Sequence, residues 1–194
     1  MTALEVVEEV ARKYQYGHDR WDQNHAEQVA RLAQEIGKQL QGLKLMPRRK
    51  GDLPLLRAAA LAHDIGRNPR SRGGGEHNRR SYETLKEELA DAAPQDQEAE
   101  TLLYCVLHHR GDQWQQDPTT GVRPRQLAGI IRVADALDYG LDQAVKAIKL
   151  RLEEGKIVLE AELRAPADME LRRAQAKADL FQEAFRQELV FRAV

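Results

Sequence analysis

The sequence predicts a mainly α-helical protein that carries a β-hairpin and a final helix near its C-terminus. Apolar residues recur every three or four positions through most of residues 1–145, which is the period of amphipathic helices. Beyond residue 146 they alternate with charged residues on both sides of Glu154 and Gly155, which is the period of strands. We therefore expect a helical domain over residues 1–145, with residues 146–194 packed on it as a hairpin and a helix.

Two amphipathic helices are expected first. An apolar stripe at the N-terminus consists of Leu4, Val7, Val10 and Ala11. A second helix begins near Trp21, and one of its faces carries His25, Val29, Leu32, Ala33, Ile36 and Leu40. A basic linker bracketed by Pro47 and Gly51 follows.

Three more helices surround polar loops. The segment LPLLRAAALAHDIG predicts a compact apolar helix, with Asp52 as its N-cap and Gly66 as its stop. A glycine-rich basic loop leads into a helix at about residues 81–90, and another apolar helix is expected at about residues 99–109. The segment LAGIIRVADALDYG predicts a further helix, which Gly140 would end.

The C-terminal region changes period. The segment AIKLRLEEGKIVLEAEL reads as two strands joined at a short glycine turn, which predicts a β-hairpin. After Pro166, the spacing of Leu171, Ala178, Phe181 and Phe185 predicts a last helix over about residues 169–190. An isolated two-stranded ribbon is marginally stable, so we expect the hairpin to dock on the rest of the chain or to join two copies in a homodimer.

Composition excludes several classes of protein. The chain has 30 Lys and Arg against 31 Asp and Glu, so its net charge favours neither nucleic acid nor a membrane surface as a partner. It has no apolar run of about 18 residues that could span a membrane, and its first residues lack the pattern of a signal peptide. The single cysteine, Cys105, cannot form an internal disulfide. These features predict a cytoplasmic protein.

The positions of histidine and aspartate point to chemistry. His63 and Asp64 end an apolar helix, where an unpaired imidazole and carboxylate would cost free energy, so both need partners. A second His-Asp dipeptide, His18 and Asp19, lies in a polar junction and is better interpreted as a surface turn.

Other histidines favour a metal ion as that partner. His25 shares the apolar face of its helix, His77 begins a helix, and His108 and His109 end one. Asp135 lies inside an apolar helix, where an ionised carboxylate should not be unpaired. Imidazole and carboxylate ligands together suit Zn, Mn, Fe or Ni, and also Mg where carboxylates and water dominate.

This order of residues resembles the HD superfamily of metal-dependent phosphohydrolases. The phrases that carry the resemblance are HAEQVARLA, LRAAALAHDIGR, EHNRRSYETL, LLYCVLHHRG and IIRVADALDYG. The sequences of these segments most resemble the HD-type C-terminal domain of the exopolyphosphatase/guanosine pentaphosphate phosphatase family. The resemblance covers about residues 10–190. The actin-like domains of those enzymes are absent, so we expect a free-standing version of their HD domain.

The resemblance implies a helical HD-domain bundle that binds one or two divalent metal ions. The residues that match a first metal site are His25, His63, Asp64 and Asp135. The residues that match a second site, with Asp64 bridging, are His77, His108 and His109. Arg67, directly after HDIG, and Arg110, directly after the His pair, are expected to act with Asp64 in catalysis by clamping phosphoryl oxygens.

The expected function is hydrolysis of a nucleotide or another small phosphorylated compound through a metal-activated water. Two alternatives stay open: a di-iron oxygenase with the HD fold, and a sensor that binds a phosphorylated ligand without turnover. His109 is followed by RGDQWQQDP, whereas cyclic-di-nucleotide phosphodiesterases of this superfamily have a Gly-Tyr-Pro motif at this position. This difference argues against cyclic-di-GMP as the substrate.

Overall fold

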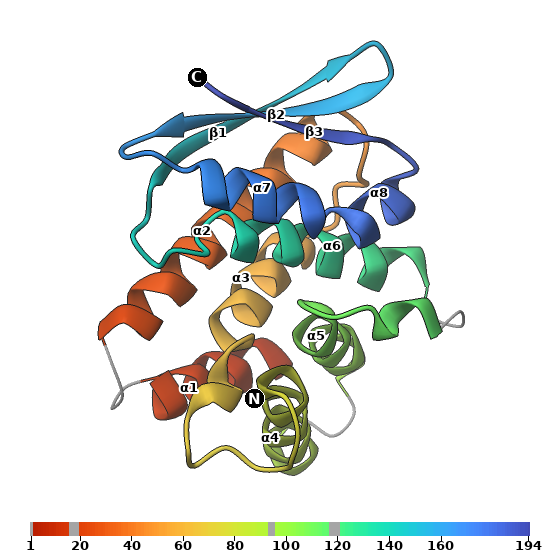
Figure 1. Ribbon diagram of the computed structural model, residues 1–194. Coiled ribbons are helices and arrows are strands. Elements are labelled where there is room, and N and C mark those ends of the chain that lie inside the picture. Colours follow the sequence, from red (N-terminus) through yellow and green to blue (C-terminus); the bar gives the residue numbers. More distant parts are fainter. Residues whose placement is uncertain (1, 16–19, 93–95, 117–120) are drawn as a thin grey trace.

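The computed structural model describes residues 2–15, 20–92, 96–116 and 121–194. Helices make up most of the molecule, and a small sheet lies at one end, with α1 and α4 at the other (Figure 1). The fold class predicted from the sequence is therefore confirmed. Within the described residues, none of the helices has both the length and the hydropathy needed to cross a membrane.

The helical part comes first in the chain. Its elements are α1 (Ala3–Gln15), α2 (Arg20–Gly42), α3 (Asp52–Ala62), the 3-10 helix η1 (Ile65–Arg67), α4 (His77–Ala92), α5 (Gln97–His108), the 3-10 helix η2 (Gln113–Gln116) and α6 (Val122–Ala136). Thus α4 begins several residues before the expected start. Similarly, α6 lies a few residues closer to the N-terminus than the sequence indicated and ends well before Gly140.

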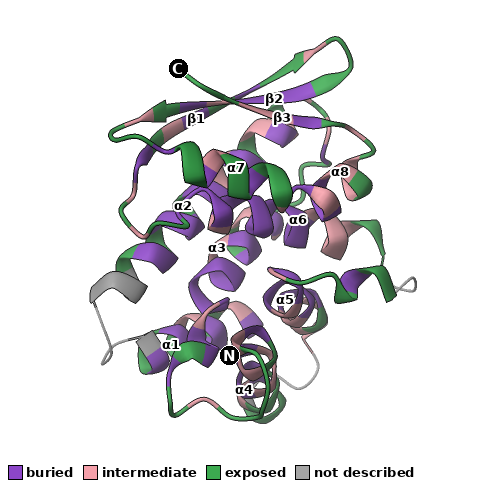
Figure 2. Ribbon diagram, viewed as in Figure 1, coloured by how far each residue is buried: buried purple, intermediate pink, exposed green. Residues whose placement is uncertain are grey.

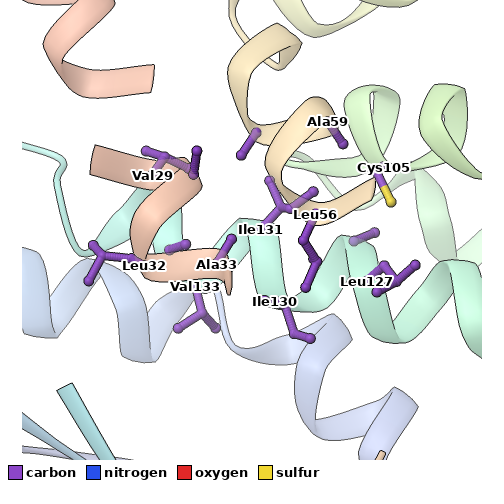
Figure 3. Packing of buried hydrophobic residues seen from close by; sticks show 14 of the residues in the cluster. Val29, Leu32, Ala33, Leu56, Ala59, Cys105, Leu127, Ile130, Ile131 and Val133 are labelled. Atoms are coloured by element: carbon purple, nitrogen blue, oxygen red, sulfur yellow. The ribbon is translucent and has the colours of Figure 1, made fainter. Parts of the chain in front are cut away.

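The core forms where α2, α3 and α6 meet. Eight of the eleven residues of α3 are buried, and α3 and the C-terminal half of α6 are mostly purple in Figure 2. Figure 3 shows side chains of α2, such as Val29, packed in one cluster with Leu56 of α3 and Ile131 of α6. A helix that is apolar on all sides is buried on all sides, which explains the compact run of alanine and leucine in α3.

The start of α3 differs from the expectation. Gly51, not Asp52, is the N-cap, and Asp52 lies inside the first turn. The Asp52 carboxylate is buried and accepts a hydrogen bond from Arg123 Nε at 2.7 Å. The expected N-cap is therefore wrong, because this carboxylate is used to join α3 to the beginning of α6. The expected stop is also wrong: α3 ends at Ala62, and Gly66 lies in η1.

The predicted hairpin is present. Strands β1 (Val145–Glu153) and β2 (Lys156–Leu163) pair antiparallel, with Leu150 opposite Leu159. The two turn residues, Glu154 and Gly155, have φ values of 50° and 77°. Positive φ at both positions gives the turn a twist that matches that of the flanking strands.

The final helix is shorter than expected and is followed by a third strand. The chain forms α7 (Asp168–Ala176), α8 (Asp179–Phe185) and then β3 (Leu189–Ala193), which pairs parallel with β2. The expectation of one helix to residue 190 is wrong. Arg186 ends α8 in the left-handed conformation, with φ of 53°, and the next apolar residues complete the sheet.

The C-terminal region packs directly on the helical part. Gln39 of α2 donates to Ile148 O at 2.9 Å and accepts from Leu150 N at 2.7 Å, which fixes β1 against α2. On the other side α6 contacts both α7 and α8. The junction between α7 and α8 thereby comes to lie beside α6. The boundary expected between residues 145 and 146 stays a prediction.

Candidate metal centre

A cavity of about 510 Å³ lies where helix ends converge. His25 enters it from α2, Asp64 and Arg67 from the end of α3 and η1, His77 from the start of α4, His109 and Arg110 from the end of α5, and Asp135 from α6. Helix ends and the turns after them are where side chains of several elements can meet around one point.

Two of the histidines are oriented in the same way. His63 and His109 are the C-caps of α3 and α5. Nδ1 of His63 lies 2.6 Å from Ala60 O, and Nδ1 of His109 lies 2.7 Å from Val106 O. Since a carbonyl only accepts, Nδ1 donates in both rings, and Nε2 is left as the nitrogen that can bind a metal. An imidazole in this tautomer binds metals through Nε2.

His25 is oriented by a carboxylate instead. Its Nδ1 lies 2.8 Å from Oδ2 of Asp138, which is fully buried and accepts a second hydrogen bond from Gln143 N through Oδ1. Its Nε2 lies 3.3 Å from Asp135 Oδ1. Burial alone would lower the pKa of His25, but the hydrogen bonds to Asp135 and Asp138 outweigh it and raise the pKa to about 10. Metal binding at this Nε2 therefore displaces a proton.

Gly66 brings His77 into the site. Its N–H donates to Ser81 Oγ at 2.8 Å, so η1 lies directly on the first turn of α4. A Cβ at residue 66 would lie 2.0 Å from His77 O, so no residue with a side chain fits. Nε2 of His77 then lies 3.1 Å from Asp64 Oδ1, while Arg110 Nη1 donates to His77 Nδ1 at 3.0 Å.

The two carboxylates divide their oxygens between histidines and cations. Oδ1 of Asp64 faces His77, and Oδ2 accepts from Arg67 Nε at 2.5 Å. Oδ1 of Asp135 faces His25, and Oδ2 accepts from Lys177 Nζ at 2.5 Å.

Both carboxylates stay ionised. Burial raises the pKa of each carboxyl. For Asp64, the neighbouring imidazoles and Arg67 outweigh burial and hold the pKa well below its usual range. For Asp135, Lys177 and then His25 have the same effect.

Metal binding fits these donors. The rings of His25, His63, His109 and His77 form a row with centroids 5.3, 4.9 and 5.4 Å apart. Two groups bring their ligand atoms within 4.8 Å of one another: His25, His63 and Asp135, and His63, Asp64 and His109. His63 Nε2 is buried without a hydrogen-bond partner within the described part of the chain, and its nearest carboxylate oxygens are 3.6 and 3.7 Å away. A buried ring nitrogen in this position, facing two carboxylates, is suited to holding a cation.

One of the expected ligands lies elsewhere. The ring of His108 packs against Tyr104, with centroids 4.3 Å apart, and lines a separate cavity between α4 and α5. Successive residues of a helix differ in direction by about 100°, so His108 and His109 cannot both face the same site. The structure does not bring His108 to the metal-binding cluster. His18 and Asp19 lie outside the described residues.

Sequence reasoning missed the cations that come from the C-terminal region. Lys177 and Arg173 line the cavity, and the Arg173 guanidinium stacks on Tyr139 at 4.5 Å. Their local sequence is that of an ordinary exposed helix, so only the packing of α7 on α6 shows where they are.

A helical bundle with histidines and aspartates converging at helix ends defines a class of metal-binding proteins. The chain matches the HD domain over residues 23–140, more than half of its length, and it belongs to that family. HD domains bind divalent metal ions, and proteins of the family are commonly metal-dependent hydrolases. A search of the curated proteins found no match.

Proposed function

We propose that the protein hydrolyses a phosphoester bond in a nucleotide or another small phosphorylated compound, with one or two divalent cations at the cluster described above. His25, His63, Asp64 and Asp135 would hold the first cation. Asp64, His77 and His109 would take part in binding a second.

One observation carries this proposal: the cavity combines imidazole and carboxylate groups, which can bind a metal, with arginine side chains, which are always positively charged. Arg67 comes three residues after Asp64, Arg110 comes directly after His109, and both line the cavity. Guanidinium groups bind phosphoryl oxygens through two parallel hydrogen bonds. A site with this lining selects an anionic ligand.

The chain's own residues have distinct tasks. A divalent cation would supply a bound water of lowered pKa and neutralise charge on the phosphoryl group. Asp138 and the carbonyls of Ala60 and Val106 hold three imidazoles with Nε2 towards the cavity. Arg67 and Arg110 would bind and orient the phosphoryl oxygens, which would stabilise charge that develops during transfer.

The alternatives are distinguished by this lining and by turnover. An oxygenase acting on a small neutral alcohol has no use for several cations around its substrate, whereas one acting on a phosphonate would use them. The lining therefore favours a phosphorylated or phosphonate ligand over an alcohol. A sensor would use the same cations and differ only in releasing no product. The closer likeness to the HD domain of the exopolyphosphatase/guanosine pentaphosphate phosphatase family stays a hypothesis, because the HD match does not distinguish between subfamilies.

The test is a metal analysis of protein purified without chelator, followed by a panel of phosphorylated metabolites with Mn, Mg, Ni or Fe. We expect release of inorganic phosphate or of a phosphomonoester from at least one compound. Asp64→Asn keeps the volume and removes the charge, so metal content should fall and turnover should drop by orders of magnitude, at about 1.4 kcal/mol per factor of ten. Arg67→Ala should retain metal and bind phosphorylated ligands more weakly.

Each alternative has its own result. Oxygen consumption with iron and no phosphate release would establish the oxygenase. Tight nucleotide binding without product over hours would establish the sensor. Wild-type turnover in Asp64→Asn with metal retained would refute the proposed mechanism.

A further inference from the structure

Lys177 reaches the candidate metal centre from outside the HD match, which ends at residue 140. It is the C-cap of α7, and its side chain lines the cavity. The 2.5 Å ion pair between its Nζ and Asp135 Oδ2 places a primary ammonium group beside a carboxylate that faces two histidines.

The arrangement around Lys177 matches that around Arg67. Each cation binds the Oδ2 atom of one carboxylate, Asp64 for Arg67 and Asp135 for Lys177, while the Oδ1 atoms face histidines. The site is thus flanked by a cation on each side, one from the HD domain and one from the C-terminal region.

The backbone of Lys177 is held in place by a buried arginine. Arg132, on α6 one turn before Asp135, donates through Nε to Lys177 O at 3.4 Å and through Nη2 to Asp179 Oδ1 at 2.6 Å. Its Nη1 donates to Gly111 O at 2.7 Å, next to Arg110. One side chain therefore connects both cation-bearing segments to the helix that carries Asp135, so Lys177 does not need to be recruited when a ligand binds.

Metal binding would weaken the ion pair between Lys177 and Asp135. A divalent cation held beside His25 and His63, which face Oδ1 of Asp135, would share this carboxylate with the ammonium group on Oδ2 and withdraw negative charge from it. The Lys177 side chain is only 26% exposed, and a cation in such a position requires a new anion. Apart from Asp64 and Asp135, which would hold the metal, the charged side chains of this lining are Arg67, Arg110, Arg173 and Lys177, so a further anion has to come from the ligand.

We propose that Lys177 is a phosphate-binding residue supplied by the C-terminal region, which binds Asp135 in the metal-free protein and a phosphoryl oxygen of the ligand once a metal is bound. This inference rests on the proposed function. It requires opposite effects of one substitution: the loss of Lys177 strengthens metal binding, because a competitor is removed, and weakens phosphate binding, because a cation is removed.

The experiment uses the full chain and two titrations, with Mn²⁺ alone and then with inorganic phosphate added to the Mn²⁺-loaded protein, both followed by calorimetry. Lys177→Met keeps most of the side-chain length and removes the charge. We expect it to bind Mn²⁺ several-fold more tightly and phosphate about tenfold more weakly, the size of one charge-assisted hydrogen bond. Lys177→Arg should keep phosphate binding within about threefold of the wild type, because it keeps the cation.

The matched control is Lys146→Met. Lys146 forms an ion pair of the same 2.5 Å length with Glu162, on the exposed hairpin and outside the cavity, so both affinities should stay unchanged. Weakening of both affinities in Lys177→Met would indicate structural damage and would overturn the inference. Unchanged phosphate affinity would overturn it too, by reducing Lys177 to a neutralising partner of Asp135.

The two proposals fail separately. Wild-type protein that binds Mn²⁺ but no phosphate would overturn the proposed function, and the role of Lys177 with it. Wild-type protein that binds both, together with Lys177→Met that behaves like Lys146→Met, would overturn the role of Lys177 alone.

Discussion

At the scale of single residues, the site depends on groups that would contact neither the metal ion nor the substrate. Asp138 sets the direction of the His25 ring, and the missing side chain of Gly66 allows α4 to approach Asp64. Neither residue offers an atom to a metal ion. Both act by fixing where another residue's ligand atom lies, and partners of this kind commonly change metal affinity by 10- to 100-fold.

Asp138→Asn tests the orientation of His25. The amide keeps an oxygen that can accept from Nδ1 but loses the charge, so the pKa of His25 should fall from about 10 towards 6.5, and Mn²⁺ should bind about 10- to 100-fold more weakly. NMR titration of the imidazole and calorimetry with Mn²⁺ measure the two effects. Asp142→Asn, on the exposed side of the same turn, is the control and should leave both values unchanged.

Gly66→Ala tests the close contact between η1 and α4. The new methyl group would meet His77 O and Ser81 N, both backbone atoms that cannot move aside alone. We expect a loss of about 1–3 kcal/mol in the free energy of unfolding, measured with urea, and weaker Mn²⁺ binding because His77 is displaced. Gly74→Ala, where nothing lies within 4 Å, should change neither. Equal stability of the two variants would contradict the contact.

At the scale of elements, the metal centre is built from ends rather than faces of helices. Two of these ends are built in the same way. Both α3 and α5 finish at a histidine whose Nδ1–H donates a hydrogen bond to a carbonyl of the last helical turn, where backbone carbonyls lack helical partners. The ring that caps the helix is thereby aimed into the site. The same interaction supplies local stability and function, so a substitution at His63 or His109 affects both.

Gly129→Ala tests the packing of α6 on α8. Helix propensity alone predicts a gain of about 1 kcal/mol. The added Cβ, however, would lie 2.8 Å from Phe181 Cα and 2.9 Å from Phe181 N, so α8 must move away and we expect a net loss of about 1–3 kcal/mol. Gly42→Ala, at the end of α2 with nothing within 4 Å, is the control and should be neutral or stabilising in urea unfolding. A stabilised Gly129→Ala variant would contradict the close approach.

The sequence predicts elements well where local pattern and final packing agree. The hairpin is such a case, because alternation and a turn with glycine are both local. The strand β3 is not, since LVFRA follows a helical stripe and its pairing with β2 depends on α7 and α8 turning the chain back. His63, His109 and Asp135 were recognisable as polar residues on apolar helices, whereas the direction of His108 and the position of Lys177 are set only by tertiary packing.

At the scale of the whole molecule, the HD domain and the C-terminal region form the site together. The sheet is fixed to α2, α8 to α6, and the α7–α8 junction to the cavity. The hydrogen bonds of Gln39 hold β1 against α2. The division into an HD-type domain and a C-terminal part, and the homodimer, stay predictions.

Stability should depend on pH in opposite ways with and without metal. A group whose pKa is raised in the folded state stabilises the fold, and for His25 this contribution is fully present at pH values below its unfolded pKa of about 6.5. It is lost as the pH rises through about 10, the pKa of His25 in the folded protein. The pKa values of Asp64 and Asp135 are lowered in the folded state, so the stability that these two carboxylates contribute is lost only at acid pH. We therefore expect the urea midpoint of chelator-treated protein to fall between about pH 6.5 and 8.5.

Bound metal reverses this trend, because it requires neutral His25. The increase in urea midpoint caused by a fixed Mn²⁺ concentration should grow with pH over the same interval. Asp138→Asn, in which the pKa of His25 is lower, should show a smaller dependence in both series. An increase that does not vary with pH would contradict protonation of His25 in the metal-free protein.

The hydrogen bond between His25 and Asp138 joins residues 113 positions apart in the chain, which has a consequence for folding during translation. A nascent chain that has exposed α1 to α5 has His25 and His63 outside the ribosome but neither Asp135 nor Asp138. It already carries Asp64 and His109, so of the two ligand groups described above only that of His63, Asp64 and His109 can assemble at this stage. Contacts of such long range form late in folding. Metal binding at the group of His25, His63 and Asp135 is therefore deferred until α6 has been translated and packed.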